Sequence, residues 1–119
     1  MVDLNNIIDI KAYNFALRVI NAYTFLKDKK QEYVLSKQLL RSGTSIGANV
    51  RESKFAQSAN DFINKLSIAL KEANETQYWL ELLHDSDFID DKTFESIHKD
   101  AKEITAILVS IIKTKKQTV

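Results

Sequence analysis

The chain has 119 residues, which is enough for one domain that buries a core of its own. Apolar residues make up 45% and charged residues 28%, a balance that excludes an intrinsically disordered chain. The formal net charge of +1 lacks the basic excess that marks many nucleic-acid-binding domains. Cysteine and proline are absent, so disulfides and thiolate chemistry are excluded and we expect few, short loops.

The small net charge conceals an asymmetry along the chain. Residues 1–60 carry nine Lys and Arg against five Asp and Glu, whereas residues 61–119 carry eight against eleven. The acidic residues concentrate in residues 81–103, and the basic ones lie in residues 27–54 and in a short tail at 113–116. Such a dipolar surface suits packing against another copy of the chain.

Neither end of the sequence indicates a membrane or export. The start, MVDLNNIIDIK, lacks a basic region followed by an apolar one, so we expect no signal peptide. The longest apolar run, residues 106–112, is far shorter than the roughly 20 residues that span a bilayer. We therefore expect a cytoplasmic protein without a membrane partner.

The first predicted helix covers residues 6–27. Apolar residues recur every three or four positions and so share one helix face: Ile8, Ala12, Phe15, Val19, Ala22 and Leu26. We expect four further residues to widen this face: Tyr13, Ala16, Ile20 and Tyr23. The polar run KDKKQ, residues 27–31, is predicted to be the first turn.

The second predicted helix covers residues 31–54. Its row keeps the same 4, 3, 4, 3 spacing: Leu35, Leu39, Ser42, Ile46 and Asn49. The row passes both glycines of the chain, Gly43 and Gly47, without losing phase. A separating loop would have no reason to preserve that phase, so we expect the helix to continue through them.

Two more helices are predicted, at residues 58–84 and 90–115. The third carries the row Phe62, Leu66, Ala69, Ala73, Thr76, Leu80 and Leu83, and the fourth carries Phe94, Ile97, Ala101, Ile104, Leu108 and Ile111. Ser58 with Asp61 resembles a capping box, and Asp90 is the expected cap of the last helix. The sequence therefore predicts an all-α, antiparallel up-down-up-down four-helix bundle that forms a single domain.

The two glycines do not form a phosphate-binding loop. Such a loop needs the pattern GxxxxGK[ST], but here the spacing is GxxxG and no lysine follows Gly47. A helix face that is nearly free of bulk explains them better, because it admits another backbone closely. We expect this face to contact a neighbouring helix, either of the same bundle or of another subunit: Ser42, Gly43, Ser45, Ile46, Gly47 and Asn49.

The stretch LLRSGTSIGANVRES, followed by FINKLSIALKEANETQYWLELL, resembles the small four-helix-bundle proteins encoded in intervening sequences of bacterial large-subunit ribosomal RNA. The resemblance covers nearly the whole chain and centres on Ser45, Ile46, Ala48 and Asn49, with Glu52 just after them. The accessory variability proteins of diversity-generating retroelements look like a branch of the same family. At Gly47, Arg51 and Ser53 this chain departs from the Pro, Ala and Gly that the family often has.

This resemblance implies a ring of identical subunits, a homopentamer, with a basic surface that binds nucleic acid. In the retroelement branch the ring engages a reverse transcriptase and its structured template RNA. That branch is much more basic than this chain. The resemblance implies no cofactor.

The basic candidates for nucleic-acid binding lie in the first half of the chain: Lys27, Lys29, Lys30, Lys37, Arg41, Arg51 and Lys54. Such cations would neutralise phosphates and give salt-dependent affinity, but they equally suit a solvated face beside Glu32 and Glu52. The tyrosines at 13, 23, 33 and 78 could stack on unpaired bases, although at least two are expected in the core or an interface. Trp79 and Leu82 lie off the core row of the third helix, as a subunit contact or as part of a wide core face.

Catalysis has little support in the sequence. His84 and His98 are distant in sequence and lack the ExxH partner of di-iron bundles, and the serines and threonine at 42–45 have no nearby histidine base. The leading hypothesis is a non-enzymatic homo-oligomeric scaffold that binds RNA or an RNA–protein complex. The alternative is a structural or protein-binding oligomer with no affinity for nucleic acid.

Overall fold

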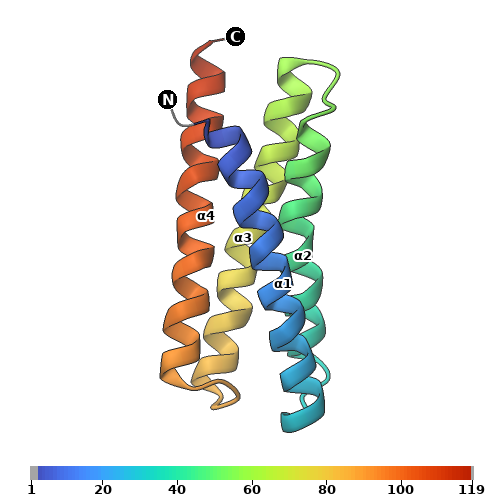
Figure 1. Cartoon of the computed structure of the whole chain (residues 1–119), viewed down its shortest axis with the longest axis vertical. Helices are drawn as coiled ribbons and strands as arrows, with labels where there is room; N and C mark the ends of the chain where they lie inside the picture. The colour runs from blue at the N-terminus through green and yellow to red at the C-terminus, as the bar shows by residue number, and fades with distance from the viewer. Residues whose placement is uncertain (1–2, 119) are drawn as a thin grey trace.

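The computed structural model describes residues 3–118 as four long helices that run up and down beside one another (Figure 1). These are α1 (Leu4–Lys30), α2 (Leu35–Ser53), α3 (Ala59–Asp85) and α4 (Asp91–Gln117). The bundle measures 47 by 24 by 19 Å, and each helix packs against its neighbours in chain order, while α1 also contacts α4. The prediction of an all-α, antiparallel four-helix bundle is confirmed.

The predicted helix rows supply the core. Nearly all of their apolar members are buried, with Leu26, Leu39, Ile46, Leu83 and Leu108 fully excluded from solvent. The expectation that Tyr13 and Ile20 widen the buried face of α1 is wrong, because these side chains remain 53% and 42% exposed. They belong to a second face of α1, one that no other helix of the chain covers.

The first connection lies later in the chain than the sequence indicated. Residues 27–30 form the last turn of α1, so the run KDKKQ ends a helix and the connection is residues 31–34. Gln31 takes a left-handed backbone conformation with φ of 50°, and the N–H of Glu32 donates to the carbonyl of Leu26 at 2.9 Å. Asp87, in the third connection, also takes a left-handed backbone conformation, with φ of 66°. Both left-handed positions are therefore filled without glycine.

Side-chain caps begin the third and fourth helices as predicted. The Ser58 hydroxyl accepts from the N–H of Asp61 at 3.0 Å, and the Asp61 carboxylate accepts from the N–H of Gln57 at 3.2 Å. The Asp90 carboxylate accepts from the N–H of Thr93 at 2.7 Å, and this bond lowers the pKa of Asp90. Each cap satisfies amide groups that the first turn of a helix leaves without partners.

Helix α2 begins at a cap that the sequence did not reveal. The Glu32 carboxylate accepts from the backbone N–H groups of Val34, Leu35 and Ser36, at 3.2, 3.1 and 2.7 Å. Burial by itself would raise the pKa of Glu32, but these three donors outweigh it and lower the pKa. A buried carboxylate is thus held ionised at the positive end of the α2 dipole.

Both glycines lie inside α2, which is continuous through them, and both face α1. A Cβ atom built on Gly43 would stand 2.7 and 2.8 Å from the two methyl carbons of Val19. A Cβ atom on Gly47 would stand 3.5 Å from the carbonyl oxygen of Ala12, an ordinary van der Waals distance. The close approach of the two helices therefore requires glycine at position 43 but only a small residue at position 47.

This difference predicts opposite effects for two similar substitutions. Gly43→Ala should destabilise the fold by about 1–2 kcal/mol, because both branches of Val19 block the new methyl group and overpacking exceeds the gain in helix propensity. Gly47→Ala should stabilise it by up to about 1 kcal/mol, because the methyl group fits. Urea unfolding measures the free energy of unfolding of both variants. Adding Val19→Ala to the Gly43→Ala variant should relieve the overpacking, so that Gly43→Ala costs less in this background than in wild type. Equal effects at the two positions would contradict the described packing.

The Glu32 cap predicts a pH-dependent contribution to stability. Its pKa is lowered in the folded chain from an ordinary value of 4.5, so its contribution is present above that value and is lost as pH falls through the folded pKa. Glu32→Gln should lower the free energy of unfolding by about 1 kcal/mol at pH 7, and the difference from wild type should shrink as pH falls below 4.5 and through the lowered folded pKa. Denaturant titrations at several pH values measure it, with the exposed Glu52→Gln as the control that should change little. A difference that stayed constant with pH would refute the cap.

Candidate assembly and RNA-binding surfaces

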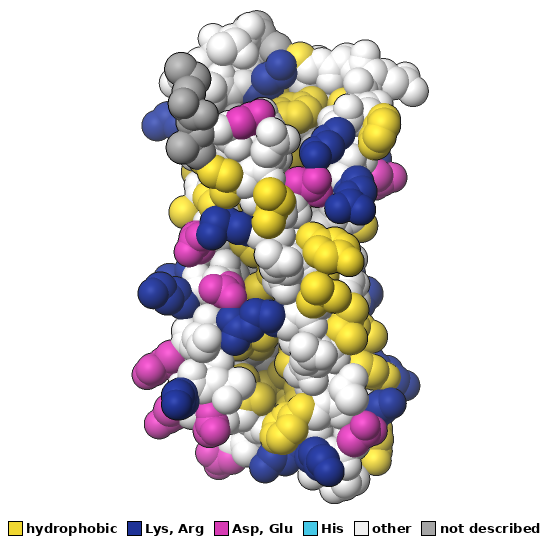
Figure 2. Space-filling view, in the orientation of Figure 1, with side chains coloured by type: hydrophobic (Ala, Val, Ile, Leu, Met, Phe, Trp, Pro, Cys, Tyr) yellow, Lys and Arg dark blue, Asp and Glu magenta, His cyan; other side chains and the backbone are white. Residues whose placement is uncertain are grey.

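A row of large apolar side chains runs along the outer side of α1. Its members recur every three or four residues and are 61%, 53%, 45% and 42% exposed, in the order Ile10, Tyr13, Leu17 and Ile20. We call these four residues the outer row. Figure 2 shows apolar side chains gathered on the side of the molecule where α1 and α2 meet. Large exposed patches of this kind mark interaction sites in soluble proteins.

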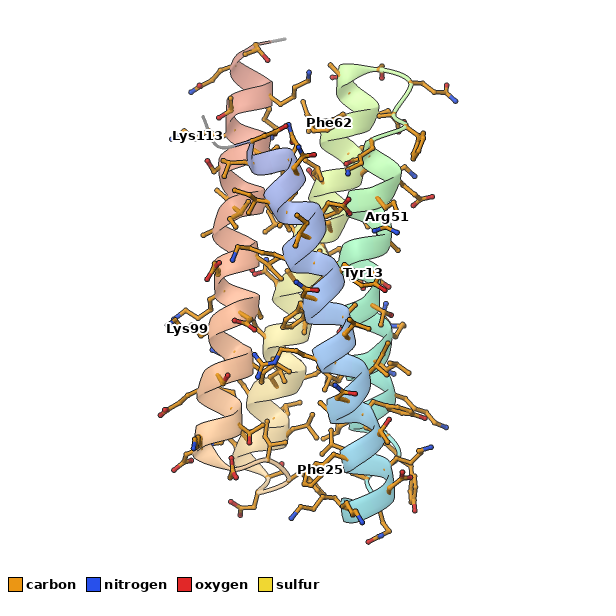
Figure 3. The ribbon with its side chains drawn as sticks, viewed as in Figure 1. Tyr13, Phe25, Arg51, Phe62, Lys99 and Lys113 are labelled. Carbon is orange, nitrogen blue, oxygen red and sulfur yellow. The ribbon has the colours of Figure 1, made fainter. Side chains whose placement is uncertain are left out.

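The outer row borders a shallow groove between α1 and α2. The groove has a volume of about 150 Å³, and its floor is made of small residues: Ala16, Thr44, Gly47 and Ala48. At one end, the guanidinium of Arg51 lies 5.7 Å from the ring centre of Tyr13 (Figure 3). Asp9 and Arg51 line the groove as well, so it combines a floor of small residues with a charged end.

The six residues of the predicted small helix face divide between two surroundings. Ser42, Gly43 and Ile46 are buried inside the bundle, whereas Gly47 both contacts α1 and lines the groove. Ser45 and Asn49 are half-buried and bond within α2: the Asn49 amide donates to the carbonyl of Ser45 at 2.9 Å. Asn49 therefore makes this hydrogen bond within its own helix.

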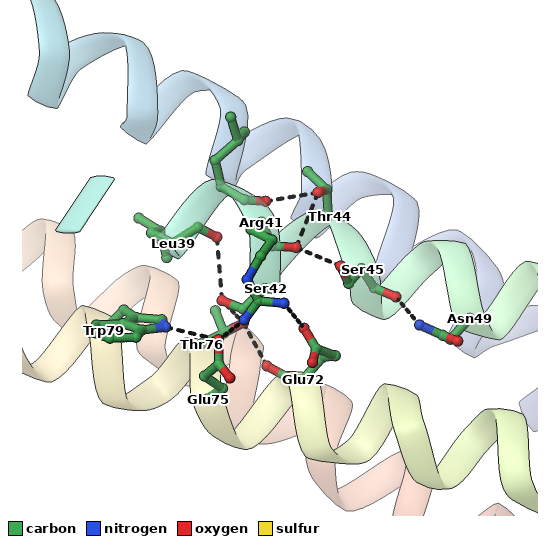
Figure 4. A network of polar contacts seen from close by, with 11 residues as sticks. Leu39, Arg41, Ser42, Thr44, Ser45, Asn49, Glu72, Glu75, Thr76 and Trp79 are labelled. Carbon is green, nitrogen blue, oxygen red and sulfur yellow. Dashed lines mark hydrogen bonds and ion pairs between the residues drawn. The ribbon is translucent and has the colours of Figure 1, made fainter. Parts of the chain in front are cut away.

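A polar network joins α2 to α3 (Figure 4). The Thr76 hydroxyl donates to the hydroxyl of Ser42 at 2.9 Å, and both residues are fully buried. At the rim, the Arg41 guanidinium donates to Glu72 at 3.0 Å and also to Glu75, whose carboxylate accepts from the indole N–H of Trp79 at 3.1 Å. The charge of Arg41 is thus paired with two carboxylates of the same chain.

Two other basic candidates share one acidic partner. The Asp9 carboxylate pairs with Lys54 at 2.6 Å and with Arg51 at 3.5 Å. The hydrogen bond from Lys54 is the main reason that the pKa of Asp9 is lowered. These two cations link the end of α2 to α1 and hold Arg51 beside the outer row.

The remaining candidates form a basic cluster where α1 ends and α2 begins. Within residues 3–118, Lys29, Lys30 and Lys37 make no ion pair, and Lys27 lies 3.7 Å from Asp28. Aromatic rings lie among them: Phe25 and Tyr33 are 44% and 51% exposed. Of the seven basic candidates, the structure therefore leaves those near the first connection available to a ligand.

The aromatic candidates on α3 lie apart from this cluster. Trp79 is half-buried and packs on the core, and Tyr78 meets it edge to face with ring centres 5.2 Å apart. Leu82 is also half-buried. None of the four tyrosines is fully buried and Tyr23 is half-buried, so the prediction that at least two lie in the core or an interface now depends on an interface.

The two histidines, distant in sequence, meet on opposite faces of one ring. Phe94 stacks against His84 at 4.2 Å and against His98 at 4.7 Å between ring centres. Asp91 accepts a hydrogen bond from His84 at 2.6 Å and is the main cause of the raised pKa of His84; Asp85 adds to it. His84 lies in α3, whereas Phe94 and His98 lie in α4. No spacing in the sequence shows that the two helices bring these three rings together.

The described part of the chain contains no cluster of histidine and acidic side chains arranged to hold a metal ion. Across the same residues, no helix is long and apolar enough to cross a bilayer. The outer row was the feature that the sequence analysis missed. Its signal was present, since Ile10, Tyr13, Leu17 and Ile20 repeat with helical spacing beside the core row.

Comparison with known proteins gives the chain a family. Its residues 5–110 match the model of the 23S rRNA-intervening sequence protein family. A solved protein of unknown function from Bacteroides thetaiotaomicron, described as a member of the S23 ribosomal protein family, is 56% identical. That similarity covers 93% of this chain and 99% of the other, with a TM-score of 0.92. None of the curated proteins matches. The chain belongs to the 23S rRNA-intervening sequence protein family.

Proposed function

We propose that this protein is a non-enzymatic scaffold that assembles with copies of itself through the outer row and binds RNA, or an RNA–protein complex, through the basic cluster. The observation that carries the proposal is the outer row: four large apolar side chains in helical register that no part of residues 3–118 covers. The homopentamer and the reverse-transcriptase partner suggested by the family resemblance are specific forms of this proposal.

Assembly through the outer row would bury apolar surface while removing few polar groups from contact with water. The groove beside it is floored by small residues, so a neighbouring helix can approach closely. Arg51 and Tyr13 lie at its edge, and these two residue types are enriched in the cores of protein interfaces. Burying the exposed part of each large side chain contributes roughly 1 kcal/mol.

Binding of RNA is supported by the basic cluster and by the name of the family. The cluster combines lysines that have no acidic partner with exposed aromatic rings, the pairing that recognises unpaired nucleotides. It is small, however, and the net charge of +1 gives little long-range attraction. An oligomer would present several clusters at once and so raise the affinity through multivalency. The second candidate function, an oligomer that binds only proteins, is favoured by that same low net charge.

The outer row is tested by two charged substitutions on α1. Ile10→Asp combined with Leu17→Asp should weaken self-association at least about tenfold, because each places a carboxylate in the buried contact. Light scattering on a sizing column measures the native mass across a range of concentrations. Phe55→Asp is the control, since Phe55 is 82% exposed in the connection after α2 and does not belong to the outer row. A wild-type monomer, or an equal loss of mass with the control, would reject assembly through the outer row.

The basic cluster is tested by neutralising three of its lysines. Lys29→Gln, Lys30→Gln and Lys37→Gln together should weaken binding of a structured RNA by about tenfold or more near 50 mM salt, and should flatten its dependence on salt. The control carries the same change in net charge on α3 and α4: Lys71→Gln, Lys99→Gln and Lys102→Gln. Fluorescence anisotropy with a labelled RNA hairpin, repeated at several salt concentrations, gives the affinity and its dependence on salt. If the two triple variants weakened binding equally, the cluster would not be the site, and if wild type bound no RNA, the second candidate function would hold.

A further inference from the structure

The end of the bundle that carries the first and third connections has two halves of opposite charge. Residues 27–34, which we call the basic half, bear the exposed Lys29 and Lys30, together with the half-buried Lys27 beside one exposed acid, Asp28. Residues 85–91, which we call the acidic half, bear four exposed aspartates and no lysine or arginine: Asp85, Asp87, Asp90 and Asp91. The halves lie side by side at the lower end in Figure 1, because α1 and α3 both descend to it.

A hollow of about 620 Å³ separates the two halves. Phe25 and Lys30 line it from α1, and all four aspartates line it from the other side. Its lining also includes the apolar side chains of Phe25, Phe88 and Ile89, and His84, which pairs with Asp85 and Asp91. On the basic half, Tyr33 and Val34 are 51% and 71% exposed. The end therefore has exposed apolar side chains and lysines on one half, and a hollow lined by carboxylates and apolar groups on the other.

We propose that this end binds the same end of a second copy of the chain, with the basic half of each copy lying on the acidic half of the other. A two-fold axis along the boundary between the halves produces this arrangement. Tyr33 and Val34 of each copy would then enter the hollow of its partner, and Lys29 and Lys30 would face the aspartates.

Charge complementarity selects a second copy over other partners. RNA held by the basic cluster would stay on the basic half, because a phosphate backbone spread across the whole end would meet four carboxylates, and a basic peptide would meet three lysines. Only a partner with the same two halves satisfies both, and a copy turned by the two-fold axis is such a partner. The contact lies at the end of the helices, so it is separate from the outer row and goes beyond the assembly proposed above.

The size of the end sets the strength that we expect. With sides of 24 and 19 Å, the end face offers about 450 Å² to each partner, below the roughly 800 Å² per partner of a stable interface. The contact should therefore be weak and dominated by charge, and salt should abolish it. Contacts through the outer row are apolar and should persist in salt, which separates the two kinds of association.

Sedimentation velocity of the full chain without RNA tests the pairing, at about 100 µM protein in about 20 mM and about 300 mM salt. We expect the mass at low salt to be twice the mass at high salt, whether the high-salt unit is one chain or a ring. Lys29→Glu with Lys30→Glu makes both halves acidic, and Asp85→Lys with Asp87→Lys removes the net charge of the acidic half, because the two new lysines offset Asp90 and Asp91. Each variant alone should remain at the single mass, and an equal mixture of the two should double.

The control is Lys113→Glu with Lys116→Glu, which makes the same change in charge at the far end of α4 and should double as wild type does. Circular dichroism confirms that each variant is folded. A wild-type mass that does not change with salt would overturn the proposal, as would variants that double alone or a mixture that does not. RNA binding that depends on Lys29 and Lys30, without any doubling, would assign this end to RNA and reject the pairing.

Discussion

The contact between Gly43 of α2 and Val19 of α1 leaves no room for a Cβ atom, and it fixes how close the two helices come. The strip of α1 that the bundle buries consists of Ile8, Ala12, Phe15, Val19 and Leu26. The next strip of α1, the outer row, is left outside, and the small residues of α2 form a groove along it. The glycines therefore stabilise the bundle and, by the same geometry, create the surface that we propose for assembly.

Internal ion pairs decide which charges remain for function. Arg41 is held by Glu72 and Glu75, and Arg51 and Lys54 are held by Asp9, so these cations serve the fold. On the other side of the bundle, Lys11 pairs with Glu103 and Arg18 with Asp100, which joins α1 to α4. At the lower end, Lys30 and four aspartates line one hollow, where His84 pairs with Asp85 and Asp91. A chain with almost no net charge thus keeps one strongly polarised surface.

The fold could be read from the sequence because one physical signal controls it. The 3, 4 spacing of apolar residues in each helix matches the period of the α-helix, and nearly every residue of those rows is buried. Ser58 and Asp90 could be placed as caps because their signal is local. The Glu32 cap was hidden, since a carboxylate that accepts from residues two to four positions later depends on the left-handed turn at Gln31. The run at 27–30 looks like a turn by composition, yet its lysines favour the end of a helix dipole.

The candidate sites could be predicted only in part, because they depend on which helices are neighbours. No spacing in the sequence shows that Arg41 faces Glu72, that His84 and His98 share the ring of Phe94, or that the first and third connections meet at one hollow. Tyr13 and Ile20 illustrate the other difficulty: a second apolar strip has the same period as the first, so only packing decides which one is core.

The absence of cysteine in this chain allows the central claim to be measured directly. A single thiol introduced by Leu17→Cys, in the outer row, can be compared with one introduced by Lys102→Cys, on the exposed side of α4. The rate of labelling by a thiol reagent is followed as protein concentration rises. The account predicts that the Leu17→Cys variant becomes protected with rising concentration while the Lys102→Cys variant keeps its rate in dilute solution. Rates that stay equal and independent of concentration would show that the outer row remains open to solvent, and would contradict assembly through it.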